Sequence, residues 1–258
     1  MIHTSTKPLR YTVLGTGLLA MVLRALLYAT AIDRKGLLMA GHWTTWSILI
    51  LSALTLGTIW LMTREIQGPA DYSDCFPASC LQGAGSLLLA GAILQRAFSL
   101  CTLAGDRLNL ISALAGFAAA LGLLIAGVCR MIPRKPGFLC HSAVSIFFAL
   151  QLVSQYRRWS ADPQLMDYGF YLAAFICLML TSYFLAGFEA DMPNHRGLVI
   201  TSMAAAFFCC LALPESGEAA LLIPCAFWAF TCAPQMQAKA KRQRAHLDLN
   251  EETEDDHS

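Results

Sequence analysis

Eight apolar runs, separated by clusters of charged residues, proline and glycine, constrain the fold of this chain more than any other feature. A helix needs roughly 20 residues to cross about 30 Å of hydrocarbon, and about 17 is the lower end. The first six runs meet this length, the seventh is short, and the eighth is shorter and contains Pro224. We therefore expect an all-α polytopic integral membrane helix bundle with about eight transmembrane helices, at residues 11–32, 43–62, 79–100, 108–129, 138–156, 168–188, 197–213 and 219–233.

The composition agrees with a membrane protein. Hydrophobic residues make up 57% of the 258 residues and charged residues 14%, with a mean hydropathy of +0.54. A soluble domain carries about 25% charged residues and would leave too much of this apolar surface in water. The alternative to eight spans is seven spans with a re-entrant last segment. Because proline frees a backbone carbonyl, the segment around Pro224 is expected to pack against protein.

The lysines and arginines are distributed unevenly between the two sides of such a bundle. Eleven lie on one side and five on the other, while Arg24 and Arg96 lie within spans. Cytoplasmic loops carry an excess of Lys and Arg, so this bias predicts cytoplasmic N- and C-termini in a multi-pass protein of the cell membrane. A transmembrane bundle at residues 1–234 would then be followed by a charged cytoplasmic tail at 235–258, where a basic and an acidic block predict disorder.

A polar helix face marks the point where the fifth span leaves the membrane. Gln155, Arg158 and Asp162 follow Gln151 at +4, +7 and +11, which is one face of a 3.6-residue helix. Gln95 similarly precedes an aspartate, Asp106, by eleven residues. The match suggests duplicated hairpins with a site at their interface, as in some transporters. The alternative is coincidence, because aspartate near a helix end is common.

Charged side chains inside a bilayer are costly and usually face protein or water, which makes Arg24 and Arg96 candidates for function. If they converge with the polar face, the result is an outward pocket with cationic walls and amide donors. Guanidinium groups bind carboxylate or phosphate in a fork, so the pocket would suit a small anionic ligand. Asp33, Asp106, Glu215 and Glu218 could instead pair with the arginines. The candidate ligand-binding residues are Arg24, Gln95, Arg96, Gln151, Gln155, Arg158 and Asp162.

Known catalytic motifs are missing from the sequence: there is no G-x-S-x-G, H-E-x-x-H, P-loop or G-x-G-x-x-G. His141 with Ser142 or Ser145 is the one local pair of base and nucleophile. Eight cysteines lie in or beside apolar runs, where cysteine behaves as a small hydrophobe. Cys75 and Cys80 are expected to be thiols without a nearby histidine, so no metal site and no cofactor are expected.

Three functional hypotheses follow. The protein binds or transports a small anionic solute through the outward polar cluster; alternatively, it is a non-enzymatic accessory or assembly subunit of a membrane complex. A membrane enzyme built around His141 ranks third, and we expect the protein not to be an enzyme. The expected partners are the lipid bilayer, a small anionic ligand, and a membrane protein or a second copy of the chain. No motif indicates binding to nucleic acid.

Overall fold

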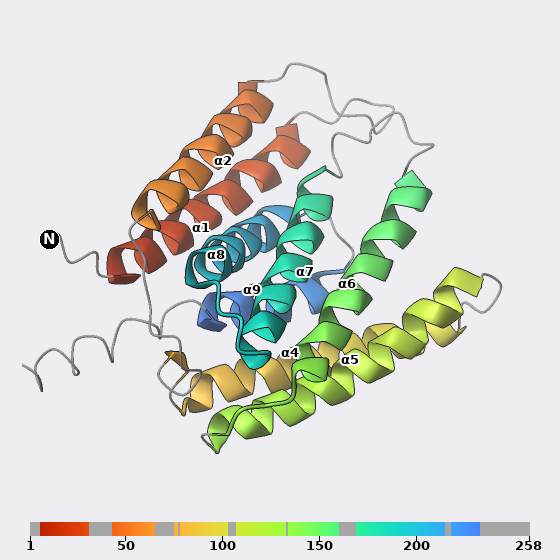
Figure 1. Ribbon diagram of the computed structural model, residues 1–258. Coiled ribbons are helices and arrows are strands. Elements are labelled where there is room, and N and C mark those ends of the chain that lie inside the picture. The colour runs from red at the N-terminus through yellow and green to blue at the C-terminus, as the bar shows by residue number, and fades with distance from the viewer. Residues whose placement is uncertain are drawn as a thin grey trace, which may run out of the picture.

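The computed structural model describes residues 6–30, 43–64, 75–76, 78–102, 107–132, 134–159, 169–214 and 218–232, with the backbone alone at 6–7 and 158–159. This part of the chain forms eight helices and no strand (Figure 1). The charged tail at 235–258 lies outside the described residues. The helices are α1 (Thr6–Thr30), α2 (Trp43–Met62), α4 (Cys80–Thr102), α5 (Arg107–Met131), α6 (Phe138–Trp159), α7 (Gly169–Glu189), α8 (His195–Ala212) and α9 (Ala219–Cys232).

Seven of these helices, all except α9, are long and apolar enough to cross a membrane. The helix α9 is too short to span the hydrocarbon core alone, because its 14 residues extend about 21 Å at 1.5 Å per residue. A polytopic membrane helix bundle is thus confirmed. The predicted eighth span forms a helix, but one that is short for the hydrocarbon core.

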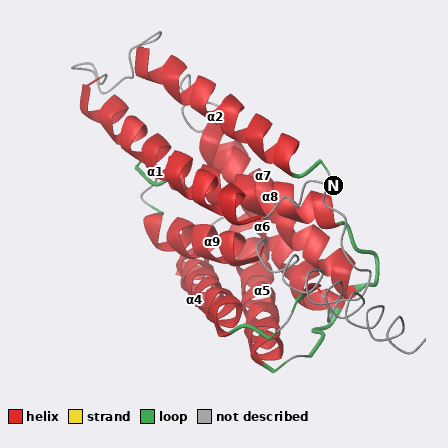
Figure 2. Cartoon of the chain, turned by 90° about the vertical axis from the view of Figure 1, so that its left-hand side faces the viewer, coloured by secondary structure: helices red, strands yellow, loops and turns green. Residues whose placement is uncertain are grey.

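Six of the helices form a closed ring. Each helix from α4 to α8 contacts the next one along the chain, and α9 contacts both α8 and α4. The remaining pair, α1 and α2, packs outside this ring against α8 (Figures 1 and 2). The short α9 therefore lies between α4 and α8, in agreement with the expectation that the helix containing Pro224 packs against protein.

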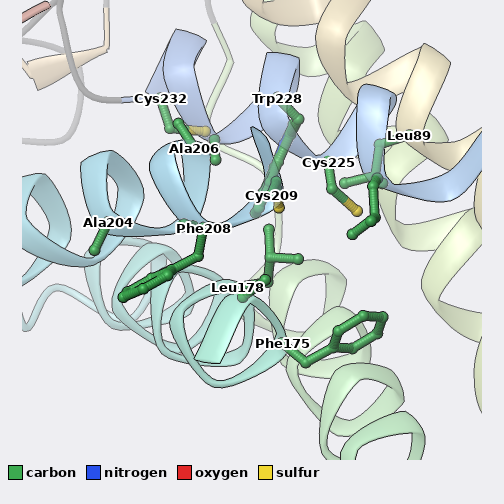
Figure 3. Close-up of a cluster of buried hydrophobic side chains, with 14 of the residues drawn as sticks. Leu89, Phe175, Leu178, Ala204, Ala206, Phe208, Cys209, Cys225, Trp228 and Cys232 are labelled. Atoms are coloured by element: carbon green, nitrogen blue, oxygen red, sulfur yellow. The ribbon is translucent and has the colours of Figure 1, made fainter. Parts of the chain in front are cut away.

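The most deeply buried of the seven long helices is α8, with 72% of its apolar window inside the protein. Asn194 caps its start by accepting a hydrogen bond from the Gly197 amide at 2.9 Å. A run of alanine, phenylalanine and cysteine then lets α1, α7 and α9 approach from different sides. Figure 3 shows part of this core, with Leu178 of α7, Cys209 of α8 and Cys225 of α9.

Glycine brings α4 and α5 close together. A Cβ atom on Gly83 would lie 3.0 Å from the Gly127 carbonyl oxygen, and one on Gly127 would lie 3.2 Å from the Gly83 carbonyl oxygen. Small residues permit such close backbone contact between membrane helices. The pair of α4 and α5 is therefore tightly packed, although the most buried of the long helices is α8.

Candidate functional site

A cluster of polar side chains surrounds Glu218, which directly precedes α9; we name it the Glu218 cluster and define it as Arg96, Gln155, Tyr171 and Glu218. Arg96 Nη2 lies 2.6 Å from Glu218 Oε1, and Gln155 Nε2 donates to the same oxygen at 3.3 Å. The Tyr171 hydroxyl donates to Glu218 Oε2. One carboxylate therefore receives donors from three helices, α4, α6 and α7.

Chain direction brings these residues to one end of the bundle. Arg96 and Gln155 lie in the last two turns of α4 and α6, whereas Tyr171 is the third residue of α7 and Glu218 precedes α9. Consecutive helices run in opposite directions, so the ends of α4 and α6 meet the beginnings of α7 and α9. The side chains of Arg96 and Glu218 keep 17% and 22% exposure, so the Glu218 cluster is partly exposed.

Gln151 lies one turn deeper than Gln155 on the same face of α6. Its side chain is buried, and its Nε2 atom has no hydrogen-bond partner in the described part of the chain. A buried donor without a partner costs about 1–3 kcal/mol. The fold thus keeps an amide donor available beside the Glu218 cluster.

Arg24 is buried near the same end, on α1, but contacts a different surface of α7. Its guanidinium lies 4.8 Å from the centre of the Phe170 ring, and Nη2 lies 3.4 Å from the Tyr28 hydroxyl. Phe170 precedes Tyr171, and successive helical residues point about 100° apart. Arg24 therefore reaches the first turn of α7 from the side and is stabilised there by cation–π contact.

The structure brings together only some of the predicted site residues. Arg96 and Gln155 meet at Glu218, with Gln151 one turn away. Gln95 is exposed on α4, whereas Gln151 is buried, so the proposed hairpin duplication does not place the two glutamines in equivalent surroundings. The Arg158 side chain and all of Asp162 lie outside the described residues, as do Asp33, Asp106 and Glu215.

A second buried pair lies at the opposite end of the ring, where α6 begins and α7 ends. His141 Nδ1 lies 2.6 Å from Glu189 Oε1, and both side chains are almost completely buried, at 1% and 0% exposure. The other atoms of the two groups, His141 Nε2 and Glu189 Oε2, have no hydrogen-bond partner in the part of the chain that the structure describes. We call these two residues the His141–Glu189 pair.

The position of Glu189 depends on how α7 ends. Asp191 adopts a left-handed conformation, with φ of 61°, and the Met192 amide donates back to the Gly187 carbonyl at 2.8 Å. This is the hydrogen-bond pattern of a Schellman helix end. The predicted span ends at residue 188, one residue too early. Glu189 is the last helical residue, and its side chain is buried in the protein.

Aromatic side chains pack at this end of the ring, and one of them lies beside His141. The Trp228 ring stacks near His141, with 6.3 Å between ring centres and 20° between planes. Phe188 contacts Phe76 and His195 edge to face, and Cys75 Sγ lies 3.9 Å from His195 Nδ1. The expectation that no histidine accompanies Cys75 is therefore wrong, because the fold brings in His195 from 120 residues away.

His141 does not contact the serines that sequence analysis considered. Ser142 Oγ donates to the Phe138 carbonyl at 2.9 Å, and Ser145 Oγ donates to the Met179 carbonyl at 3.2 Å. Both hydroxyls thus bond to helix carbonyls, which is how such groups are usually satisfied in membrane helices. A hydrolase pair of His141 with either serine has no support in this geometry.

Sequence analysis missed Tyr171 entirely and considered Glu189 only as part of a loop. Tyr171 and Glu218 are 47 residues apart, and His141 and Glu189 are 48 apart, so no local pattern links them. A helix-face pattern gives a weak signal for Glu189, which follows the buried Leu185 at +4.

No group of three metal-ligating side chains occurs among the described residues. A comparison of the chain with protein-family models, with characterised proteins and with solved structures finds no match. The two polar groups at opposite ends of the ring, and the helices that join them, are therefore the basis for assigning a function.

Proposed function

We propose that this protein binds a small carboxylate-bearing solute at the Glu218 cluster and carries it across the cell membrane. The observation that supports this proposal is the convergence of Arg96, Gln155 and Tyr171 on one partly exposed carboxylate. Ionisable groups within membrane helices are costly and commonly mark solute or ion pathways. The positive-inside bias assigns this cluster to the outer side.

The chemistry of the cluster favours a zwitterion such as an amino acid. Arg96 and Glu218 provide one positive and one negative group at 2.6 Å, so a solute carrying both charges can replace each partner with its own. The solute carboxylate would bind the Arg96 guanidinium, and its ammonium group would bind Glu218. The unpartnered amide of Gln151 is a further donor, one turn deeper.

A carrier fits the interior of the ring better than an open pore does. Phe148, Phe175 and Leu178 lie between the Glu218 cluster and the His141–Glu189 pair, and all three are at most 1% exposed. Phe148 and Phe175 pack edge to face at 5.7 Å. This buried apolar layer requires the helices to move before a solute can pass, as in alternating access.

Thermal stability in detergent tests the binding step. Purified protein is heated with glycine, L-glutamate, acetate or inorganic phosphate, as wild type, as Arg96→Gln and as the exposed neighbour control Gln95→Ala. A ligand that binds only the folded state stabilises it by about 2.7 kcal/mol at a hundred times its Kd. We expect an amino acid to raise the melting temperature of wild type and Gln95→Ala, and to leave Arg96→Gln unchanged.

A specific observation supports the accessory subunit as a second candidate. Arg96 is already paired with Glu218, and Arg24 is stacked on Phe170, so both arginines have partners within the chain. In that case the Glu218 cluster would stabilise the bundle without binding a solute. No melting-temperature shift with any of the four ligands, together with strong destabilisation by Arg96→Gln alone, would reject transport in favour of this candidate.

A further inference from the structure

We propose that the His141–Glu189 pair is a proton-binding site, and that protons taken up there drive the movement of the solute. The second half of this statement rests on the proposed transport function, whereas proton binding itself does not. The proposal depends on the burial of the pair, on its two unpartnered atoms and on the helices that it shares with the Glu218 cluster.

The pair can hold one proton or two while it keeps its 2.6 Å contact. With one proton, on Nδ1, the imidazole is neutral and the carboxylate gives the pair a net charge of −1. A second proton on Nε2 makes the pair neutral overall. His141 Nε2 and Glu189 Oε2 are both buried without a hydrogen-bond partner in the described part of the chain, so each has an unused position for a proton or its donor.

The test must distinguish proton binding at His141 from a change of charge at a neighbouring group. Cysteine ordinarily titrates near pH 8.5, and arginine stays protonated throughout. His195 is therefore the neighbour that needs a control, because histidine is the side chain whose charge normally changes between about pH 5 and 8. Among the described residues, the titratable or charged groups at this end include Cys140 on α6, Cys129 and Arg130 on α5, Cys232 on α9, His195 and Arg196 on α8, Cys75, and the ion pair of Lys135 with Asp191.

Shared helices connect the proton site to the proposed solute site. The helix α6 carries His141 near its start and Gln155 near its end, while α7 carries Tyr171 and Glu189 in the reverse order. The third connection is α9, which follows Glu218 and places Trp228 beside His141. A change in net charge at the pair therefore acts on three of the four helices that carry or flank the Glu218 cluster, with α4 as the fourth.

Trp228 provides a direct optical measurement of proton binding. A protonated imidazole quenches indole fluorescence more strongly than a neutral one, and Trp228 stacks near His141. Full-length protein in detergent is titrated between about pH 5 and 8 as wild type, Trp228→Phe, His141→Gln and His195→Gln. The contribution of Trp228 is the difference between the wild-type signal and that of Trp228→Phe.

We expect this contribution to fall in one step on acidification, to lose the step in His141→Gln and to retain it in His195→Gln. A flat wild-type signal would overturn the proposal, and so would a step that survives in His141→Gln. Because the wild-type curve alone can reject the proposal, the test remains valid if His141→Gln does not fold.

Coupling is tested separately in proteoliposomes with radiolabelled glycine. An inward proton gradient should increase uptake by wild type and have no effect on Glu189→Gln, because without the carboxylate a second proton on His141 would leave a buried positive charge without its partner. Glu189→Gln should still show the glycine-dependent rise in melting temperature, because the Glu218 cluster is unchanged. Gradient-independent uptake by wild type would overturn coupling and leave transport intact, whereas no glycine binding by wild type would reject the proposed function instead.

Discussion

At the scale of single residues, Glu218 explains most of the polar arrangement at one end of the ring. Its carboxylate accepts donors from Arg96, Gln155 and Tyr171, which lie on three different helices. Hydrogen bonds to a charged group contribute about 1.5–3 kcal/mol, more than bonds between neutral groups. Glu218 therefore both fixes the positions of these helices and supplies the negative charge of the candidate site.

Removing the Tyr171 hydroxyl isolates one of these contacts. Tyr171→Phe should lower the free energy of unfolding by about 2 kcal/mol, because the ring stays in place and the bond to Glu218 is lost. Tyr183→Phe is the matched control on the same helix, since Tyr183 is 62% exposed and should change stability by less than about 0.5 kcal/mol. Unfolding in detergent gives both values, and equal effects of the two substitutions would contradict a structural role for the Tyr171–Glu218 contact.

Some of these residues could be recognised as site candidates from the sequence and others could not, for a physical reason. Arg24 and Arg96 stand out because charge is rare in apolar helices, and Gln151 and Gln155 share a helix face that can be counted in the sequence. Glu218 was considered as an ion-pair partner, but Tyr171 and Glu189 obtain their roles from helices packed across the ring. Contacts between distant segments leave no periodic signal in a single sequence.

At the scale of helices, the positions and lengths of the apolar runs in the sequence were enough to locate nearly every helix. The predicted spans 43–62 and 219–233 match α2 (Trp43–Met62) and α9 (Ala219–Cys232) at or within one residue of each end. The central position of α8 was not predicted, because burial within a membrane bundle does not change the hydropathy of a helix. The small residues of α4 and α5 permit close packing of this pair, but small residues alone do not indicate which helix lies innermost.

Two glycines provide a matched test of close helix packing. A Cβ atom on Gly122 would lie 2.6 Å from the Cys140 carbonyl oxygen, whereas one on Gly91 would meet nothing within 4 Å. Gly122→Ala should therefore push α5 and α6 apart and cost about 1–3 kcal/mol. Gly91→Ala should leave stability unchanged or raise it by up to about 1 kcal/mol, because alanine favours the helix. Melting temperatures in detergent distinguish the two, and a harmless Gly122→Ala would contradict the observed α5–α6 contact.

At the scale of the whole molecule, six helices close into a ring with a polar group at each end and a buried apolar layer between them. The same helices, α6, α7 and α9, connect the Glu218 cluster to the His141–Glu189 pair. The class of protein follows from the sequence, since length and hydropathy determine it. Ring closure through α4 and α9 depends on contacts between segments far apart in the chain, and those contacts were not predicted.

If Glu218 holds the solute that the protein carries, removing its negative charge should stop uptake. Uptake of radiolabelled glycine into proteoliposomes tests this most directly, with wild type, Glu218→Gln and the exposed control Gln95→Ala compared at equal protein content. We predict saturable uptake by wild type and Gln95→Ala, and uptake at the level of empty liposomes for Glu218→Gln. Uptake by Glu218→Gln equal to that of wild type would show that Glu218 does not hold the solute.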